Sequence, residues 1–181
     1  LEKIGYRAFA NCTRLKSVTI PGSVTYMDQQ VFDMCSNLTN VTILEGVTKI
    51  SESAFSDCVK LTTVKIPSSV TTIEKYAFYN CAKLTNVKIP NGVTKIGESA
   101  FWSCVSLTQI ILPDSVTTID RSAFVNCNNV TTLRISSNLK TIALDVFGKC
   151  NSLSTVIIPY GVTEIGMSAF SECENLNSVI I

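Results

Sequence analysis

The sequence predicts a repeat solenoid, a curved rod in which each coil of the chain stacks on the coil before it. Two residue types share one period. The eight cysteines recur every 23 residues from Cys12 to Cys173, and all eight phenylalanines lie three residues before a cysteine. Self-similarity at a fixed period of about 20 to 50 residues is the signature of stacked repeat architectures. We therefore expect about eight 23-residue coils.

The segment after each cysteine predicts a β-strand. An aliphatic residue always stands three places after the cysteine, as Leu61 does after Cys58. Aliphatic residues also stand six and eight places after it, as Val64 and Ile66 do, with mostly polar residues between them. This alternation is typical of a strand with one buried face. Stacking of the coils would join these strands into a parallel sheet on the concave side.

The rest of each coil predicts a turn, a short second strand and a further turn. All five prolines stand directly after the strand, where a residue without an N–H group ends the ladder. A second apolar pair follows, such as Val70 with Ile73, and then a motif such as Ala100-Phe101-x-x-Cys104. We expect this motif to form a short helical or 3₁₀ turn on the side opposite the sheet.

We expect residues 1–181 to form a single solenoid domain. Leu1 already occupies a second-strand position and Ile181 ends a first strand, so both ends interrupt a repeat. No polar capping repeat is visible, which predicts an excerpt of a longer array that lacks its caps.

Composition argues against two classes of partner. The 15 Lys and Arg residues nearly balance the 14 Asp and Glu residues, which predicts no overall attraction to nucleic acid. Polar residues recur every few positions, so no apolar run approaches the roughly 18 residues needed for membrane insertion. The segment Leu1–Gly5 shows no pattern of a signal peptide, and a trimmed start would remove one.

The motifs Leu15-x-x-Val18-x-Ile20-Pro21 and Ala54-Phe55-x-x-Cys58 resemble the BspA-like, or Treponema pallidum-type, leucine-rich repeat. The resemblance covers the whole chain. It implies a leucine-rich-repeat-like solenoid, found in surface proteins that adhere to host matrix proteins or to other cells, and it brings no catalytic residues. The departures are Leu44 and Ser136 in place of proline, Met27 in place of isoleucine, and Val31 and Val146 in place of alanine. We expect local changes in the second and sixth coils.

The residues predict neither an enzyme nor a metal or cofactor site. The chain has no histidine, so the commonest general base and a frequent zinc ligand are missing. No Gly-rich phosphate-binding motif occurs. Equal spacing points the cysteines inward about one strand spacing apart, farther than the roughly 3.8 Å between Cβ atoms that a disulfide requires. We therefore expect buried reduced thiols that act as small apolar side chains.

The outward positions of the strand segments predict a binding surface. The residues two to eight places after each cysteine include seven of the 15 basic residues and none of the 14 acidic ones. A basic face rich in hydroxyl and amide groups suits an acidic protein segment or an anionic glycan. The candidate partner-binding residues are Lys60, Lys65, Lys83, Asn86, Lys88, Gln109, Ile111 and Arg134.

Other interpretations remain open at this stage. Thr and Lys also suit exposed strands for structural reasons alone. Trp102 and Tyr79 fall on the opposite side, where either could anchor a partner or simply cover the neighbouring coil. The leading hypothesis is a cell-surface or secreted recognition module that binds a host matrix or cell-surface protein or an anionic glycan. The alternative is a cytoplasmic scaffold, in which eight free thiols would be stable.

Overall fold

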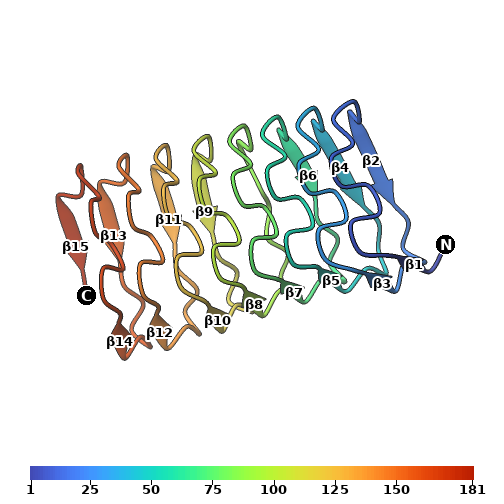
Figure 1. The fold of residues 1–181 in the computed structure, drawn as a ribbon. Coiled ribbons are helices and arrows are strands. Elements are labelled where there is room, and N and C mark those ends of the chain that lie inside the picture. The colour runs from blue at the N-terminus through green and yellow to red at the C-terminus, as the bar shows by residue number, and fades with distance from the viewer.

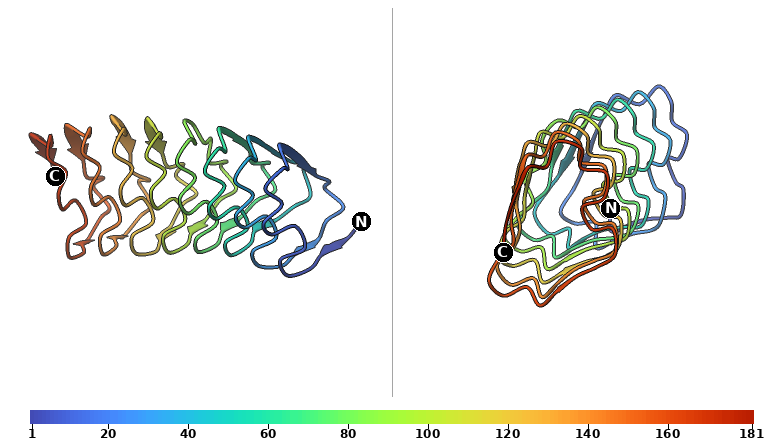
Figure 2. Two further views of the ribbon diagram at one scale, coloured as in Figure 1. Left: turned by 45° about the horizontal axis from the view of Figure 1, so that its top comes forward. Right: turned by 90° about the vertical axis from the view of Figure 1, so that its left-hand side faces the viewer.

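A computed structural model describes residues 1–181 as a parallel β-solenoid of about eight coils without a helix (Figure 1). The end-on view in Figure 2 shows the coils nearly superposed around one shared interior. Fifty buried apolar residues form one continuous core through it. The predicted solenoid is confirmed.

Strands follow the cysteines in every coil but the fourth, and they line one side of the solenoid, which we call the strand face. Parallel pairing joins them into three short sheets, β2-β4-β6, β9-β11 and β13-β15. Each pair is in register by one repeat, so that Val18 lies beside Val41 and Val41 beside Val64. The strands are β2 (Ser17–Ile20), β4 (Asn40–Ile43), β6 (Thr63–Lys65), β9 (Gln109–Ile111), β11 (Thr132–Arg134), β13 (Thr155–Ile157) and β15 (Ser178–Ile180).

Two-residue strands form a second ladder, at the lower edge of Figure 1. They pair as β1-β3, β5-β7-β8-β10 and β12-β14. Threonine hydroxyls reinforce both ladders by donating to carbonyls one coil earlier, as Thr71 does to Thr48 and Thr62 to Thr39. The second strands are β1 (Lys3–Ile4), β3 (Tyr26–Met27), β5 (Lys49–Ile50), β7 (Thr72–Ile73), β8 (Lys95–Ile96), β10 (Thr118–Ile119), β12 (Thr141–Ile142) and β14 (Glu164–Ile165).

The segment before each cysteine forms hydrogen-bonded turns, and its side of the coil is called the turn face below. The expected helical turn does not develop into a helix, because alternate N–H groups leave the coil. Trp102 and Cys104 donate three residues back within their own coil, whereas Phe101 and Ser103 donate to the next coil. The residues five places and one place before every cysteine have φ between 51° and 62°. This backbone conformation directs the alternate N–H groups toward the next coil. The hydrogen bonds between coils offset the cost of this left-handed conformation.

The phenylalanines form one continuous stack along the interior. Successive ring centroids lie 5.1 to 5.8 Å apart, with interplanar angles of 1° to 20°. The six rings from Phe32 to Phe147 are fully buried, while Phe9 in the first coil is 43% exposed. Uniform stacking of this kind requires identical ring depth in each coil, as the 23-residue period predicts.

The cysteines are free thiols, six of them buried, as expected. Their polar role goes beyond the expectation of small apolar side chains. Seven thiols donate to the phenylalanine carbonyl of the preceding coil, at Sγ···O distances of 3.2 to 3.6 Å. Cysteine therefore fits this position because it is small and apolar yet satisfies a buried carbonyl.

The two proline replacements differ in their local structure. Leu44 is exposed, whereas Ser136 is fully buried. The Ser136 hydroxyl donates to the carbonyl oxygen of Val116, 2.6 Å away in the preceding coil. The sixth coil thus keeps the fold by replacing a ring with a hydrogen bond.

Candidate functional site

A groove of about 360 Å³ opens on the strand face between the fourth and sixth coils. Five of the eight predicted partner-binding residues line it, namely Asn86, Lys88, Gln109, Ile111 and Arg134. The other three, Lys60, Lys65 and Lys83, lie exposed in the third and fourth coils, outside the groove lining. The structure therefore brings most of the predicted set together at one place.

The groove coincides with a break in the strand ladder. Coil four contributes no strand at this position, and Asn86 faces Thr63 only through an isolated bridge. Apart from this bridge, the backbone groups of Asn86–Ile89 make no backbone hydrogen bond to either neighbouring coil. Coils three and five flank the segment, so the break is not an open sheet edge, but it leaves polar backbone groups in the lining of the groove.

Two amide side chains at the groove are also free of protein partners. Neither the Asn86 nor the Gln109 amide takes part in any side-chain hydrogen bond. Asn40, at the same repeat position two coils before Asn86, accepts a hydrogen bond from Thr63 at 2.6 Å. Each amide offers both donors and an acceptor. Unlike Asn40, they keep this capacity for a bound molecule.

Positive charge on the strand face is largely uncompensated. Seven basic residues have a carboxylate within 4.0 Å, which leaves eight of the 15 without one. Six of those eight follow the cysteines on the strand face: Arg14, Lys16, Lys60, Lys65, Lys83 and Lys88. Pairing elsewhere removes most of the competing positive charge, so the net positive potential is concentrated on this face.

Arg134 differs from these lysines in a way that its position in the repeat does not indicate. Its guanidinium contacts the Asp114 carboxylate at 2.8 Å and donates to the carbonyl of Leu112 at 2.6 Å. The backbone N–H and the hydroxyl of Ser137, together with Arg134, hold the pKa of Asp114 below its ordinary value. Arg134 thus positions the groove wall and contributes little free charge.

Apolar side chains complete the strand face toward its C-terminal half. Ile111 is 40% exposed and Ile157 is 60% exposed. Exposed aliphatic surface beside polar groups is a common composition of protein-binding surfaces.

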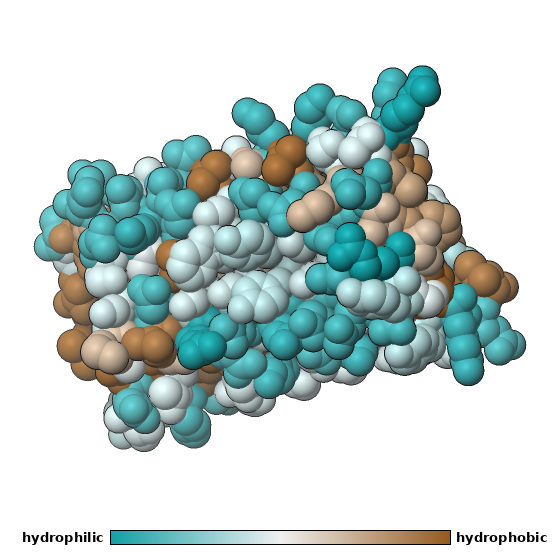
Figure 3. Space-filling view, in the orientation of Figure 1, coloured by the Kyte–Doolittle hydropathy of each residue, from teal (hydrophilic) through white to brown (hydrophobic).

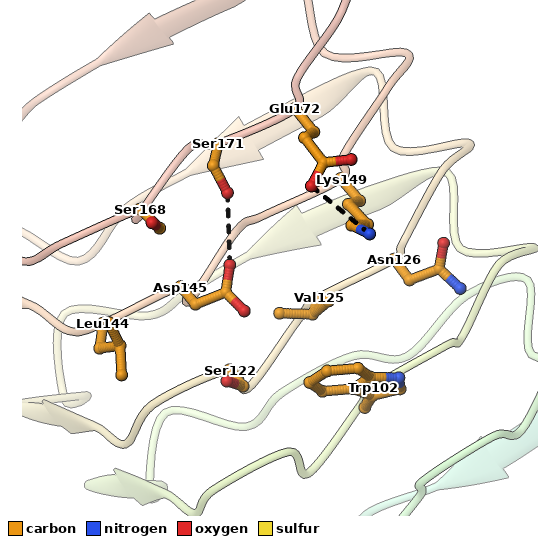
Figure 4. Close-up of a pocket in the computed structure, with 10 residues that line it drawn as sticks. All are labelled: Trp102, Ser122, Val125, Asn126, Leu144, Asp145, Lys149, Ser168, Ser171 and Glu172. Atoms are coloured by element: carbon orange, nitrogen blue, oxygen red, sulfur yellow. Dashed lines mark hydrogen bonds and ion pairs between the residues drawn. The ribbon is translucent and has the colours of Figure 1, made fainter.

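The turn face carries two hollows that the sequence did not indicate, and one of them is larger than the groove. One of about 540 Å³ is lined by Trp102, Asp145 and eight further residues (Figure 4). Another of about 360 Å³ adjoins it and shares Trp102, Ser122 and Leu144. Figure 3 shows that hydrophilic and intermediate side chains cover the middle of the face turned to the viewer.

The thiols offer no reactive nucleophile in the interior. Burial raises the pKa of Cys150 to about 12, and it raises the pKa of Cys81 and Cys127 as well. A thiol with a raised pKa stays protonated at neutral pH, and the thiolate is the nucleophilic form. The ladder is therefore a structural feature of the core.

The sequence profile described as a BspA-type leucine-rich repeat region matches residues 1–84 and 71–181. The chain belongs to this family. Repeats of this family form solenoids that serve in recognition or as scaffolds, and the fold of this chain is such a solenoid. No curated protein matches the sequence significantly. The structure contains no helix that could span a membrane.

Crystal structures of three bacterial proteins are similar to this one. A leucine-rich repeat protein of Bacteroides ovatus is 27% identical with a TM-score of 0.87, over 92% of this chain and 45% of its own. The leucine-rich repeat protein of T. pallidum is 28% identical with a TM-score of 0.86, over 91% and 79%. A leucine-rich cell surface protein of Faecalibacterium prausnitzii is 29% identical with a TM-score of 0.57, over 99% and 69%. The chain thus spans less than half of the B. ovatus protein.

Proposed function

We propose that this solenoid is a non-enzymatic recognition module of the cell surface that binds an acidic segment of a partner protein across its strand face. The binding residues are Lys60, Lys65, Lys83, Asn86, Lys88, Gln109, Ile111 and Arg134, centred on the groove at Asn86. The observation that carries the proposal is the concentration of unpaired basic side chains on one face of a near-neutral chain.

The unpaired backbone of Asn86–Ile89 favours an extended peptide over an anionic glycan. An extended peptide lying in the groove offers N–H and C=O groups to the free amides of Asn86 and Gln109 and to the exposed backbone between them. Its acidic side chains would reach Lys65 and Lys88, which are both exposed and hold the same repeat position in the third and fourth coils. A sulfated glycan would use the charges but would leave the alternating backbone groups unmatched.

One of the comparisons supports a role at the cell surface. The similar F. prausnitzii protein is described as a leucine-rich cell surface protein.

The test uses a short fluorescein-labelled peptide of alternating Glu and Thr residues and measures its fluorescence anisotropy. We expect saturable binding that weakens with added salt, because exposed charges are screened beyond roughly 8 Å at physiological ionic strength. Lys65→Glu combined with Lys88→Glu should weaken binding at least about tenfold, equivalent to about 1.4 kcal/mol.

The matched control is Lys3→Glu combined with Lys140→Glu. It makes the same change in net charge with two lysines that lack carboxylate partners and lie off the strand face. Its affinity should stay within about twofold of the parent protein. Equal losses in both double variants, or binding of heparin oligosaccharides but not of the peptide, would refute the proposal.

A further inference from the structure

The turn-face column that contains Trp102 changes abruptly in side-chain size. The residues two places before successive cysteines are Tyr79, Trp102, Val125, Gly148 and Ser171. The two aromatic residues are followed by the smaller Val125 and then by Gly148, which has no side chain. The drop in side-chain volume after Trp102 coincides with the 540 Å³ hollow, which Trp102, Val125 and Ser171 of this column line.

The indole of Trp102 forms one wall of this hollow. One side of the ring packs against Tyr79, with centroids 6.4 Å apart and planes inclined by 29°. Figure 4 shows the ring seen nearly edge-on, with Val125 and then Asp145 above its other side. Val125 therefore lies over part of the second face of the indole, and the rest of that face borders the hollow.

Gly148 keeps the Asp145 carboxylate in place. A Cβ atom at Gly148 would lie 2.2 Å from Asp145 Oδ1, so any side chain there displaces the carboxylate. Asp145 Oδ1 accepts only a long bond of 3.5 Å from Ser171, and Oδ2 has no protein donor. Burial raises the pKa of the Asp145 carboxyl, as expected for a partly enclosed group with few donors.

The remaining polar groups at the hollow are mostly uncharged. Asn126 donates to Ser103 at 2.9 Å, which leaves its carbonyl oxygen free. The Ser122 and Ser168 hydroxyls have no side-chain partner in the protein. Lys149 and Glu172 neutralise each other at 3.5 Å. The hollow thus combines one aromatic face with several hydroxyl and amide groups and one acceptor carboxylate.

We infer that the hollow beside Trp102 is a binding site for a neutral saccharide. A pyranose ring has an apolar C–H face, which packs on the electron-rich face of an indole, and hydroxyls around its edge. Asp145 and Asn126 accept from these hydroxyls, while the serines donate or accept. Pockets of about 300 to 1,000 Å³ are the usual size for small-molecule sites.

The adjoining hollow makes an oligosaccharide the better fit than a single sugar. It shares Trp102, Ser122 and Leu144 with the first hollow, and Tyr76 and Tyr79 also line it. These two tyrosine rings are 5.8 Å apart and nearly perpendicular, at 80°. A linked second sugar unit therefore finds a second aromatic surface. This site lies on the turn face, so it is independent of the peptide groove.

Intrinsic fluorescence provides a direct test, because Trp102 is the only tryptophan in the chain. The probes are cellobiose, lactose, maltose and N,N′-diacetylchitobiose, each titrated to about 10 mM, ten times a Kd of about 1 mM. We expect at least one disaccharide to give a saturable change in emission. Added tetramethylammonium should not reverse it.

Saturation-transfer NMR then measures the same sugar with variants of the site. Trp102→Leu should weaken binding at least about tenfold, and Trp102→Phe should retain it within about threefold, because phenylalanine keeps an aromatic face. Asp145→Asn should weaken binding, since the amide replaces one acceptor by a donor. Tyr160→Ala, a fully exposed aromatic outside the hollow, is the matched control.

Three results would overturn the inference: no saturable response to any of the four sugars, unchanged binding in Trp102→Leu, or complete competition by tetramethylammonium. The last result would indicate a site for organic cations. Circular dichroism of each variant verifies the fold. The Lys65→Glu and Lys88→Glu double variant should bind the sugar normally, so that failure of one proposal leaves the other testable.

Discussion

Removing one ring from the phenylalanine stack tests the central packing feature of this solenoid. Phe101 is fully buried and stacks on both neighbours, with centroids 5.2 Å from Phe78 and 5.1 Å from Phe124. Phe9 has the same place in its coil but is 43% exposed and stacks only on Phe32. The substitutions Phe101→Ala and Phe9→Ala therefore remove the same atoms from different surroundings.

The expected magnitudes follow from burial and from the number of aromatic contacts. Truncation of a buried phenylalanine costs about 3 to 5 kcal/mol, and each aromatic pair contributes about 0.5 to 1.5 kcal/mol beyond burial. Phe101→Ala removes two aromatic pairs and leaves a buried cavity that water does not fill. We therefore expect it to lower the free energy of unfolding by about 5 kcal/mol. For Phe9, with one pair and partial exposure, we expect about 2 kcal/mol.

Urea unfolding followed by far-UV circular dichroism gives both values by linear extrapolation. Phe101→Leu should fall between the parent protein and Phe101→Ala, because leucine restores much of the volume without the stack. Equal costs for Phe9→Ala and Phe101→Ala would show that burial and stacking do not set the stability. A cost below about 2 kcal/mol for Phe101→Ala would show the same.

Three further changes test the hydrogen bonds and the titration of the core. Cys104→Ala should cost about 0.5 to 1.5 kcal/mol more than Cys104→Ser, because serine still donates to the carbonyl of Phe78, whereas alanine leaves that oxygen with only the backbone N–H of Cys81 as a donor; urea unfolding of both variants measures the difference. Ser136→Ala should lower the unfolding free energy by about 1 to 3 kcal/mol, since it removes the donor to Val116; a thermal midpoint equal to that of the parent would contradict this. Burial raises the pKa of Cys150 from its ordinary 9.0 to about 12, so the native state keeps a proton that the unfolded chain releases. Its contribution to stability is complete below pH 9.0 and is lost as the pH rises toward 12, by about 1.4 kcal/mol per pH unit; unfolding curves of Cys150→Ser across this range should show a correspondingly smaller slope.

The two proposed sites separate two kinds of recognition on opposite sides of one rod. The strand face offers unpaired lysines and unpaired backbone, which suit an acidic extended peptide. The turn face offers an aromatic wall and a neutral polar rim, which suit a sugar. A solenoid exposes both faces along its length because only its interior and its coil-to-coil contacts are needed for folding.

Much of the strand-face site could be predicted from the sequence. Asn86, Lys88, Gln109 and Ile111 were expected to lie on one face because side chains alternate along strands, and the structure confirms that placement. The groove itself could not be predicted, since it depends on the missing ladder at Asn86–Ile89. Nothing in the composition of that coil distinguishes it from its neighbours.

Contacts between residues at different positions of the repeat were also beyond the sequence. Asp114 follows β9 in the fifth coil and lies outside the strand positions of the repeat, yet its carboxylate contacts Arg134 of the next coil. The thiol-to-carbonyl hydrogen bonds link Cys104 to Phe78, 26 residues earlier, instead of the 23 of the repeat. A strict period identifies which residues share a column but not which columns touch.

The sequence alone determined the number of coils, the residues of the core and the face that carries each side chain. A fixed interval of apolar residues permits only a stacked interior, because one coil cannot bury its own apolar side chains. Only the tertiary structure decided where backbone pairing fails and where hollows form. Both depend on how side chains of different size pack between adjacent coils, which is settled only once the coils are stacked.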